Sequence, residues 1–187
     1  PAKKFHIQTG ETVVSAKEKC PDLTLVPPNY DLYNKSSKAL IKLLSEYTDK
    51  IEQYSIDEAF LDMTGCCDDS ERTAHEIKDR VHAQLGFTVN IGVSENKLLA
   101  KMASDFMKPD RVHTLWKSEI QTKMWPLPVS ELFYVGHASL NKLRKLGIHT
   151  IGELAATDPG ILQAHMKSQG LLIWQYANGI DETAVIA

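Results

Sequence analysis

Two adjacent carboxylates, Asp57 and Glu58, are the residues whose types and spacing best suit chemistry. They interrupt QYSIDEAFLDMTG, residues 53–65, where apolar and polar residues otherwise alternate as in a half-buried strand. Because neighbouring residues of a strand point to opposite faces, one of the acids would enter the apolar side, which is unfavourable unless something compensates. A hairpin between two short strands, or a bulge, would instead aim both side chains at one place.

Two carboxylates that converge repel each other, so such a pair requires a cation. Mg²⁺ is the hard ion that proteins usually hold with one or two carboxylates together with substrate phosphates. The alternative is a solvated acidic turn, but Asp-Glu is poor chemistry for a tight hairpin, which favours Asn-Gly or Asp-Gly. Burial is predicted for the apolar flanking residues Tyr54, Ile56, Phe60 and Leu61. We therefore expect both acids to bind a metal.

A lysine-bearing helix is predicted in SENKLLAKMASDFMKPDR, residues 94–111. Its apolar face would pack in the core and consists of Leu98, Leu99, Met102, Ala103 and Phe106. Lys97, Lys101 and Lys108 lie at spacings of four and seven residues along another face. Such a stripe is usually only a solvated helix face. Next to an acidic metal site, it predicts a binding site for phosphates.

The surrounding segments predict an α+β domain over residues 1–115. Helical spacing of apolar residues predicts helices over 31–49 and 70–85, and β-branched residues predict a strand over 87–93. Ser94 or Asn96 would cap the third helix and Pro109 would stop it. The order helix, strand, strand, helix, strand, helix matches the ferredoxin-like β-α-β-β-α-β arrangement without its first strand.

Beyond Trp116 the pattern is all helical and predicts a second, smaller domain over residues 116–187. Three local signals mark helix ends: a C-terminal cap at Gly147, a capping box of Thr150 and Glu153, and a helix start at Asp158 and Pro159. The segment MWPLPVS, residues 124–130, contains two prolines and is predicted to link the two domains.

The composition is that of an ordinary globular protein, with 43% hydrophobic and 24% charged residues among 187. A net charge of −3 gives no overall attraction to nucleic acid, so DNA binding would depend on local patches. Without an apolar run of roughly 20 residues, we expect no membrane span and a cytoplasmic protein. The three cysteines include no CxxC pair, which suits a reducing compartment and predicts no zinc site. Because the chain starts at Pro1 without a methionine, we expect a piece of something longer.

Three motifs of this chain resemble consecutive motifs of one family. YSIDEAFLDMTG, NIGVSENKLLAKMASDFMKPD and YVGHASLNKLRKLGIHTIGELA are similar to motifs of the Y-family translesion DNA polymerases, close to the bacterial UmuC and DinB branches of the ImpB/MucB/SamB family. The likeness covers essentially the whole chain in the family's order, including AKKFHIQTGE and CPDLTLVPPNYDLY, which resemble the segments leading from fingers to palm. It implies a partial fingers region and a ferredoxin-like palm, followed by a helix-hairpin-helix thumb.

The resemblance implies a role for each matching residue. Asp57 and Glu58 match the adjacent metal-binding acids of the palm, which with one further aspartate hold two Mg²⁺ ions. Lys108 matches the lysine that contacts the incoming deoxynucleoside triphosphate, and Lys3 stands where the family often has an arginine on the same triphosphate. Contacts with DNA are implied for Lys97 and Lys101 and, in the thumb, for Gly136, Lys142 and Arg144.

The implied activity is translesion synthesis by a DNA-directed DNA polymerase, as part of DNA repair and the SOS response of a bacterium. The implied partners are primer-template DNA, including damaged DNA, and a deoxynucleoside triphosphate. A sliding clamp is a further candidate partner, reached through C-terminal regions outside this chain, and no membrane is involved.

Some features of the family differ here or are expected outside the chain. The family's first metal-binding aspartate and the aromatic residue that excludes ribonucleotides would precede Pro1, and the little-finger domain would follow GIDETAVIA. We therefore expect that this piece alone does not extend a primer, and that another chain covers the sheet edge left open by the missing strand. In the thumb hairpin, Tyr134 replaces the first glycine of the family's Gly-x-Gly, while Gly136 remains.

Two other readings stay open at this point. A catalytically silent relative would serve as a DNA-binding or protein-docking module, although the presence of Asp57, Glu58 and Lys108 opposes that reading. The other reading is a stand-alone helix-hairpin-helix domain beside an unrelated α/β partner. Three motifs in the order of a single family argue against it.

Overall fold

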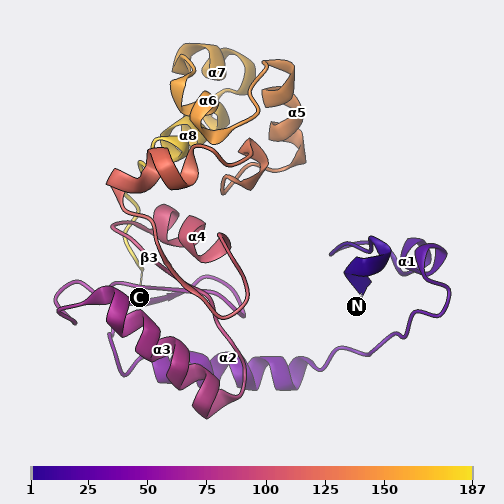
Figure 1. Cartoon of the computed structure of the whole chain (residues 1–187), viewed down its shortest axis with the longest axis vertical. Helices are drawn as coiled ribbons and strands as arrows, with labels where there is room; N and C mark the ends of the chain where they lie inside the picture. Colours follow the sequence, from indigo (N-terminus) through magenta and orange to yellow (C-terminus); the bar gives the residue numbers. More distant parts are fainter. Residues whose placement is uncertain (1, 187) are drawn as a thin grey trace. The chain divides into compact units, whose positions relative to one another are not determined.

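The computed structural model describes residues 2–186, and the chain divides into two compact units between Tyr33 and Asn34. The first unit contains the short helix η1 (Ala2–Phe5) and the helix α1 (Val13–Lys19). Helix α2 (Tyr30–Leu44) begins in the first unit and continues into the second. The remaining elements belong to the second unit, which contains both predicted active-site acids (Figure 1).

The strands of the second unit form two separate two-stranded sheets. One is an antiparallel hairpin of β1 (Ile51–Gln53) and β2 (Ala59–Leu61), and the other is a parallel pair of β3 (Ile91–Val93) and β4 (Val112–Thr114). The order α2, β1, β2, α3, β3 is the predicted ferredoxin-like arrangement after its first strand, where α3 spans Ser70–Leu85. The α+β palm is therefore confirmed.

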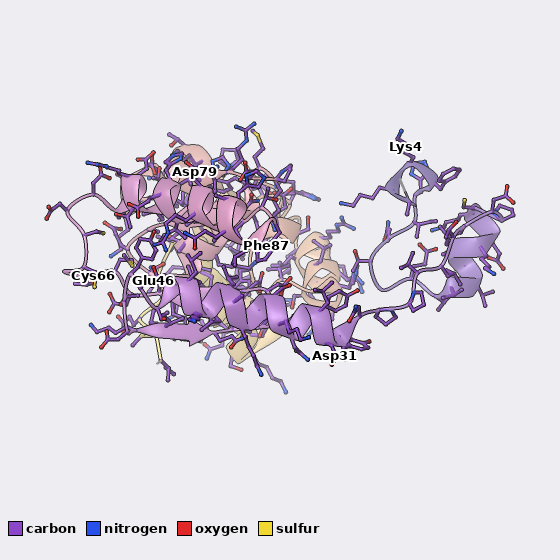
Figure 2. All side chains as sticks on the ribbon, turned by 90° about the horizontal axis from the view of Figure 1, so that it is seen from below. Lys4, Asp31, Glu46, Cys66, Asp79 and Phe87 are labelled. Atoms are coloured by element: carbon purple, nitrogen blue, oxygen red, sulfur yellow. The ribbon has the colours of Figure 1, made fainter. Side chains whose placement is uncertain are left out.

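Helices α2 and α3 lie side by side and share one apolar core with the strands (Figure 2). Its buried centre consists of Leu43, Leu44, Ile77 and Val81. Polar contacts add to this packing, since Arg80 of α3 pairs with Glu46 at 2.6 Å and donates to the Tyr47 hydroxyl at 2.9 Å. Helix α3 has the predicted bounds because Asp69 caps its start and Gly86, at φ 76°, ends it.

The elements after β4 are all helices up to residue 186, as predicted. In chain order the elements are η2 (Lys117–Glu119), η3 (Ile120–Met124), η4 (Val129–Glu131), α5 (His137–Lys145), α6 (Ile151–Ala156), α7 (Pro159–Met166) and α8 (Ser168–Ala177). The predicted caps are confirmed: Gly147 has φ 75°, Thr150 and Glu153 form the capping box, and Asp158 caps α7.

One apolar core joins this helical region to the helix α4 (Lys97–Asp105). Leu98, Leu99 and Met102 of α4 are buried in the same cluster as Leu143 and Ile151. The segment predicted as a linker also packs into this core: the Trp125 indole N–H donates to the Ala177 carbonyl at 2.9 Å, and the Val129 amide donates to the His149 carbonyl at 2.8 Å. Helix α4 therefore connects the palm to the thumb through packing.

Two predicted boundaries differ from the structure, and one strand was not predicted. The strand predicted over 87–93 is confined to β3, because the Asn90 side chain bonds the carbonyls of Ser104 and Met107 and the amide of Arg111. The first predicted helix ends at Leu44 rather than near residue 49. Strand β4 was not predicted, since three residues are too few to show a periodic pattern. None of the described helices has the length and hydropathy needed to cross a bilayer.

Candidate active site

The β1–β2 hairpin holds both predicted catalytic acids in its connecting loop, residues 54–58. Gln53 pairs with Ala59 as the last strand pair, and the amides of Tyr54 and Ser55 donate to the Glu58 carbonyl at 2.9 and 3.1 Å. The loop thus closes directly after the strands, and neither acid lies within regular strand. This confirms the predicted hairpin and explains how two acids interrupt an alternating pattern.

Polar contacts support the hairpin at its loop and at its base, the end away from the loop. Asp57 is exposed, and the Ser55 hydroxyl donates to its Oδ1 at 2.8 Å. At the base, Asp62 accepts the Thr64 amide at 2.9 Å and pairs with Lys50 at 3.2 Å. The hydrogen bonds from Thr64, with the ammonium of Lys50, lower the pKa of Asp62 to about 2. Ser55 and Asp62 therefore have structural roles in the hairpin.

The burial predicted for the residues that flank the acids is wrong for Tyr54 and Ile56. Their exposed fractions are 46% and 47%. Both lie in the loop beyond the last strand pair, where the chain no longer has one face against the core. Phe60 and Leu61 lie within β2 and are partly buried. The alternation of side chains thus predicts burial only as far as the strand pairing extends.

Helix α4 is fixed beside this loop by a cap and by a close contact with β3. The Asn96 side chain accepts the Leu99 amide at 2.9 Å and caps the helix, so of the two predicted caps, Ser94 and Asn96, it is Asn96 that serves. Gly92 of β3 allows the helix to lie directly on the strand, because a Cβ at this position would collide with the Ala100 carbonyl and the Ser104 amide. Since the apolar face of α4 enters the core, its lysines face the hairpin.

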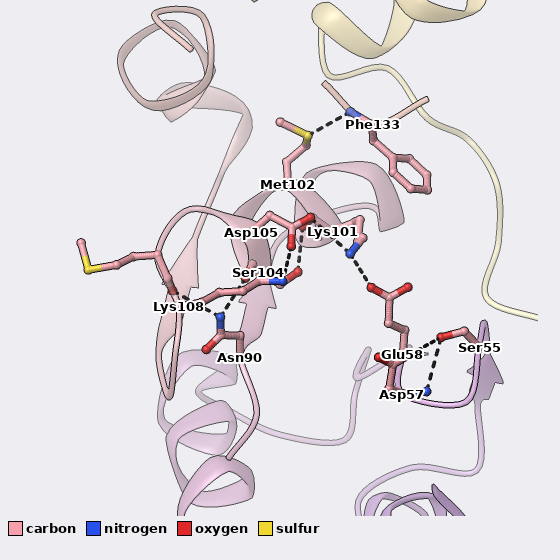
Figure 3. A network of polar contacts seen from close by, with 11 residues as sticks. Ser55, Asp57, Glu58, Asn90, Lys101, Met102, Ser104, Asp105, Lys108 and Phe133 are labelled. Atoms are coloured by element: carbon pink, nitrogen blue, oxygen red, sulfur yellow. Dashed lines mark hydrogen bonds and ion pairs between the residues drawn. The ribbon is translucent and has the colours of Figure 1, made fainter. Parts of the chain in front are cut away.

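Four side chains of alternating charge run from the hairpin loop to the end of α4 (Figure 3). The Lys101 ammonium lies 2.5 Å from Glu58 Oε1 and 3.2 Å from Asp105 Oδ2. The other oxygen of Asp105, Oδ1, lies 2.7 Å from the Lys108 ammonium. The predicted metal-binding glutamate and the predicted triphosphate lysine are thereby joined through Lys101 and Asp105.

Lys101 is shielded from solvent, whereas Asp105 and Lys108 are exposed. The side chain of Lys101 is 15% exposed and that of Lys108 is 57% exposed. Burial lowers the pKa of Lys101, but the hydrogen bonds to Glu58 and Asp105 outweigh it and leave the pKa above its ordinary value. Burial likewise raises the pKa of Asp105, and the bonds from Lys108 and Lys101 bring it below its ordinary value. Both groups are therefore charged at neutral pH.

Lys97, one turn earlier on α4, pairs with a different glutamate of the hairpin. Its ammonium lies 2.8 and 2.7 Å from the two carboxylate oxygens of Glu52 in β1, and 5.1 Å from the centre of the Phe60 ring. Glu52 Oε2 also accepts the Ile186 amide at 2.9 Å. Lys97 and Lys101 are thus engaged with acids of this chain, and their contact with DNA stays a prediction.

The other predicted site residues are exposed. Lys3 lies on η1 in the first unit. Gly136 precedes α5 as its N-cap and has open space beside its Cα. Lys142 and Arg144 lie in the last turn of α5, and neither forms an ion pair with any residue from 2 to 186. These positions leave them accessible to a ligand, and their contacts with nucleotide or DNA stay predictions.

An aromatic strip that sequence reasoning missed connects the hairpin loop to the thumb. The ring centres of Tyr54 and Phe133 lie 6.3 Å apart, those of Phe133 and Tyr134 4.9 Å apart, and those of Tyr134 and Tyr176 5.8 Å apart. Tyr134 has φ 72°, a left-handed conformation that is unfavourable for tyrosine and suits the glycine expected from the family pattern. Edge-to-face contacts on both sides of its ring offset part of that strain.

Sequence reasoning also missed Asp105 and Glu52 as partners of the lysines. Asp105 follows Lys101 by four residues and precedes Lys108 by three, which are the spacings at which helical side chains meet. That signal was available in the sequence. Glu52 carried no such signal, because its partner lies 45 residues away and depends on how α4 packs against the hairpin.

The donor atoms at the hairpin loop fit a hard divalent cation. Asp57 and Glu58 supply carboxylate oxygens, the ligand type that Mg²⁺ prefers, and each is at least partly exposed. Among residues 2–186, no three His, Cys, Asp or Glu side chains gather into a ready-made metal cage. Two carboxylates suit a divalent cation that takes further ligands from outside the protein rather than one enclosed by protein alone.

Family comparisons agree with the motifs on which the site was built. Residues 1–105 match the model of the impB/mucB/samB family, and residues 117–148 match that of the IMS family HHH motif. DNA polymerase IV of Clostridium acetobutylicum is 51% identical over 187 residues, which are 99% of this chain and 47% of that protein. DNA polymerase IV 1 of Bacillus subtilis is 44% identical over 186 residues, which are 98% of this chain and 45% of that protein.

Solved structures with the same fold come from similar polymerases. A DinB family error prone DNA polymerase from Sulfolobus solfataricus matches with a TM-score of 0.87 and 28% identity, over 98% of this chain and 57% of its own. An insertion ternary complex of Dbh DNA polymerase matches with a TM-score of 0.84 and 28% identity, over 98% and 55%. The chain spans about half the length of the curated relatives it matches.

Proposed function

Since the chain belongs to the impB/mucB/samB family, we propose that it provides the palm acids and the thumb of a DNA-directed DNA polymerase that performs translesion synthesis. The observation that carries this proposal is the chain of charges from Glu58 through Lys101 and Asp105 to Lys108. It joins a carboxylate suited to a metal with an exposed lysine suited to a phosphate. Nucleotidyl transfer onto a primer requires both.

The chain's own residues hold and orient the reactants. Asp57 and Glu58 would bind Mg²⁺, which supplies charge neutralisation at the phosphates and activation of the primer hydroxyl. We propose two such ions in the complete enzyme. Asp105 holds the Lys108 ammonium at 2.7 Å on the exposed side of α4, where it can bind the triphosphate of the incoming nucleotide. Lys3 is proposed as a second cation for the same triphosphate.

The thumb is proposed to hold the DNA backbone. Gly136, the N-cap of α5, has no side chain and has open space beside it. A phosphate can therefore approach the backbone amides at the start of this helix closely. Lys142 and Arg144 add two exposed cations at the other end of that helix. With about two to four phosphate contacts, log affinity should fall with log salt with a slope of about −0.9 for each contact on duplex DNA.

Primer extension by the full-length protein, with Mg²⁺ and deoxynucleotides, tests the proposal. Asp57→Ala and Glu58→Ala should abolish extension while primer-template binding persists, because the thumb is unchanged. Asp62→Asn is the matched control, since this acid of the same hairpin pairs with Lys50 and should leave extension intact. No extension by the unmodified protein would show a catalytically silent relative, and an unaltered rate in Asp57→Ala and Glu58→Ala would show that these two acids do not carry the reaction.

We further propose that residues 1–187 alone do not extend a primer. Within residues 2–186, no third acid joins Asp57 and Glu58 in a group that could hold a metal, and two carboxylates give too few bridging ligands to place two ions. Asp57-dependent extension by the isolated 187-residue chain would contradict this. A sliding clamp as partner, a role in the SOS response and a cytoplasmic location stay expectations from the resemblance.

A further inference from the structure

The two lysine–glutamate pairs between α4 and the hairpin differ in how completely the protein satisfies them. Glu52 receives two contacts from Lys97 and one from the Ile186 amide, and its side chain is 19% exposed. Glu58 receives Lys101 on Oε1 alone, and its side chain is 38% exposed. The Glu58 carboxylate is thus the one that a ligand from solvent can reach.

The lysines differ in a complementary way. Lys97 has one acidic partner, so withdrawing Glu52 would leave a shielded ammonium with no carboxylate beside it. Lys101 has two acidic partners, Glu58 and Asp105, so withdrawing Glu58 still leaves Asp105 at 3.2 Å. A shielded charge that loses its only partner is strongly unfavourable. Lys101 can therefore release its glutamate at much smaller cost than Lys97 can.

From this asymmetry we infer that Lys101 is a resident counter-ion of the carboxylate site, which neutralises Glu58 until a divalent cation takes that carboxylate and then remains paired with Asp105. The inference rests on the proposed role of Glu58 as a metal ligand. Lys101 is a positioning residue in this role, because it acts on the metal site through Glu58. It competes with the cation and so disfavours metal binding before the nucleotide phosphates arrive.

Electrostatics fixes the direction of the effect. An ammonium near Glu58 repels a divalent cation, and at such close range this repulsion persists even in the high dielectric of water. Replacing Lys101 with an uncharged residue should therefore tighten the binding of a free divalent ion on the order of tenfold. A purely structural lysine would give the opposite sign, since its loss would loosen the loop and weaken the site.

The test measures Mn²⁺ binding to the full-length protein without DNA or nucleotide, by the loss of the electron paramagnetic resonance signal of the free ion. Lys101→Gln should bind Mn²⁺ about tenfold more tightly than the unmodified protein. Lys97→Gln is the matched control, because it removes an equally shielded lysine from the same helix and should change the affinity less than about twofold. No tightening in Lys101→Gln would overturn the inference.

A double-mutant cycle distinguishes two explanations of a change in Mn²⁺ affinity. One is that Lys101 releases Glu58 and stays paired with Asp105, and the other is only the change in net charge near the site. Asp105→Asn removes the fallback partner of Lys101 and should weaken Mn²⁺ binding. In the Lys101→Gln background that weakening should largely disappear, because there is no ammonium left to hold. Equal effects of Asp105→Asn in both backgrounds would contradict the proposal that Lys101 leaves Glu58 and remains paired with Asp105. Thermal unfolding of each variant shows whether the fold persists, and Lys101→Met repeats the test if Lys101→Gln unfolds.

Failure of the proposed function would look different from failure of this inference. If Glu58→Gln leaves the Mn²⁺ affinity of the protein unchanged, Glu58 is not a metal ligand and both proposals fall. If Glu58→Gln abolishes binding but Lys101→Gln does not tighten it, the metal site stands and only the role of Lys101 is wrong.

Discussion

Helix α4 presents two lysines, one turn apart, to two glutamates of the same hairpin, and the surroundings make one pair closed and the other open. The Lys97 ammonium lies 5.1 Å from the centre of the Phe60 ring and donates to the Ala184 carbonyl, and Glu52 accepts the Ile186 amide. Lys101 and Glu58 lie at the loop, with Asp105 as a third member. The number of other partners that each charge has therefore decides the role of an ion pair. One pair holds the structure together, and in the other pair a ligand can replace one of the two partners.

The largest effect is expected from a change that displaces both pairs together. Gly92→Ala places a Cβ against the Ala100 carbonyl and the Ser104 amide, which are backbone atoms and cannot rotate away. Helix α4 must move off β3, at a loss of about 3 kcal/mol of unfolding free energy. Urea unfolding measures the loss. Ala100→Gly in the Gly92→Ala background is not expected to restore stability, because the collision involves the carbonyl; recovery there would contradict the explanation.

The next effect separates the two pairs. Lys97→Gln leaves Glu52 shielded without its ammonium and should lower the unfolding free energy by about 2 kcal/mol. Lys101→Gln should lower it by less than about 1 kcal/mol, because Glu58 can turn its carboxylate to water. Urea unfolding of both variants at pH 7 gives the comparison. Equal losses of unfolding free energy would show that the two ion pairs stabilise the fold equally.

Sequence reasoning predicted this region unevenly, for physical reasons. The hairpin, the cap at Asn96 and the lysine stripe depend on residues close together in the chain, and the structure has all three. The partners of the lysines depend on packing of α4 against β3 through Gly92, which no local pattern reveals. For the same reason the exposure of Tyr54 and Ile56 was missed, since it depends on where strand pairing stops.

The thumb was predicted more completely because its helix ends are encoded locally. Gly147, the box of Thr150 and Glu153, and Asp158 each act within four residues of the helix end they define. The core that joins α4 to the thumb was not predicted, although the apolar face of α4 was. The spacing of apolar residues predicts which face of a helix is buried. The residues against which that face packs follow only from the three-dimensional fold.

Acid should reduce the contrast between the two lysine variants. The hydrogen bond from Lys97, with that from the Ile186 amide, lowers the pKa of Glu52 below its ordinary value of 4.5. A lowered pKa in the folded state gives stability that is present above the ordinary value and is lost as pH falls through the folded-state value. The deficit of Lys97→Gln should therefore shrink from about 2 kcal/mol at pH 7 to less than about 1 kcal/mol well below pH 4.5. A deficit independent of pH would mean that Lys97 stabilises through packing alone.

The smallest expected effect concerns the chain segment that helps to close the Lys97 pair. Asp181 accepts the Leu98 amide at 3.1 Å, one residue after Lys97, so its carboxylate complements the start of α4 alongside the Asn96 cap. Asp181→Ala should lower the unfolding free energy by about 0.5 to 1 kcal/mol and leave Mn²⁺ binding unchanged. Asp181→Asn retains an acceptor and loses only the charge, so its smaller loss should largely fade with added salt, whereas part of the loss in Asp181→Ala should remain. A shift in Mn²⁺ affinity in Asp181→Ala would show that the closed and open pairs are coupled along the helix.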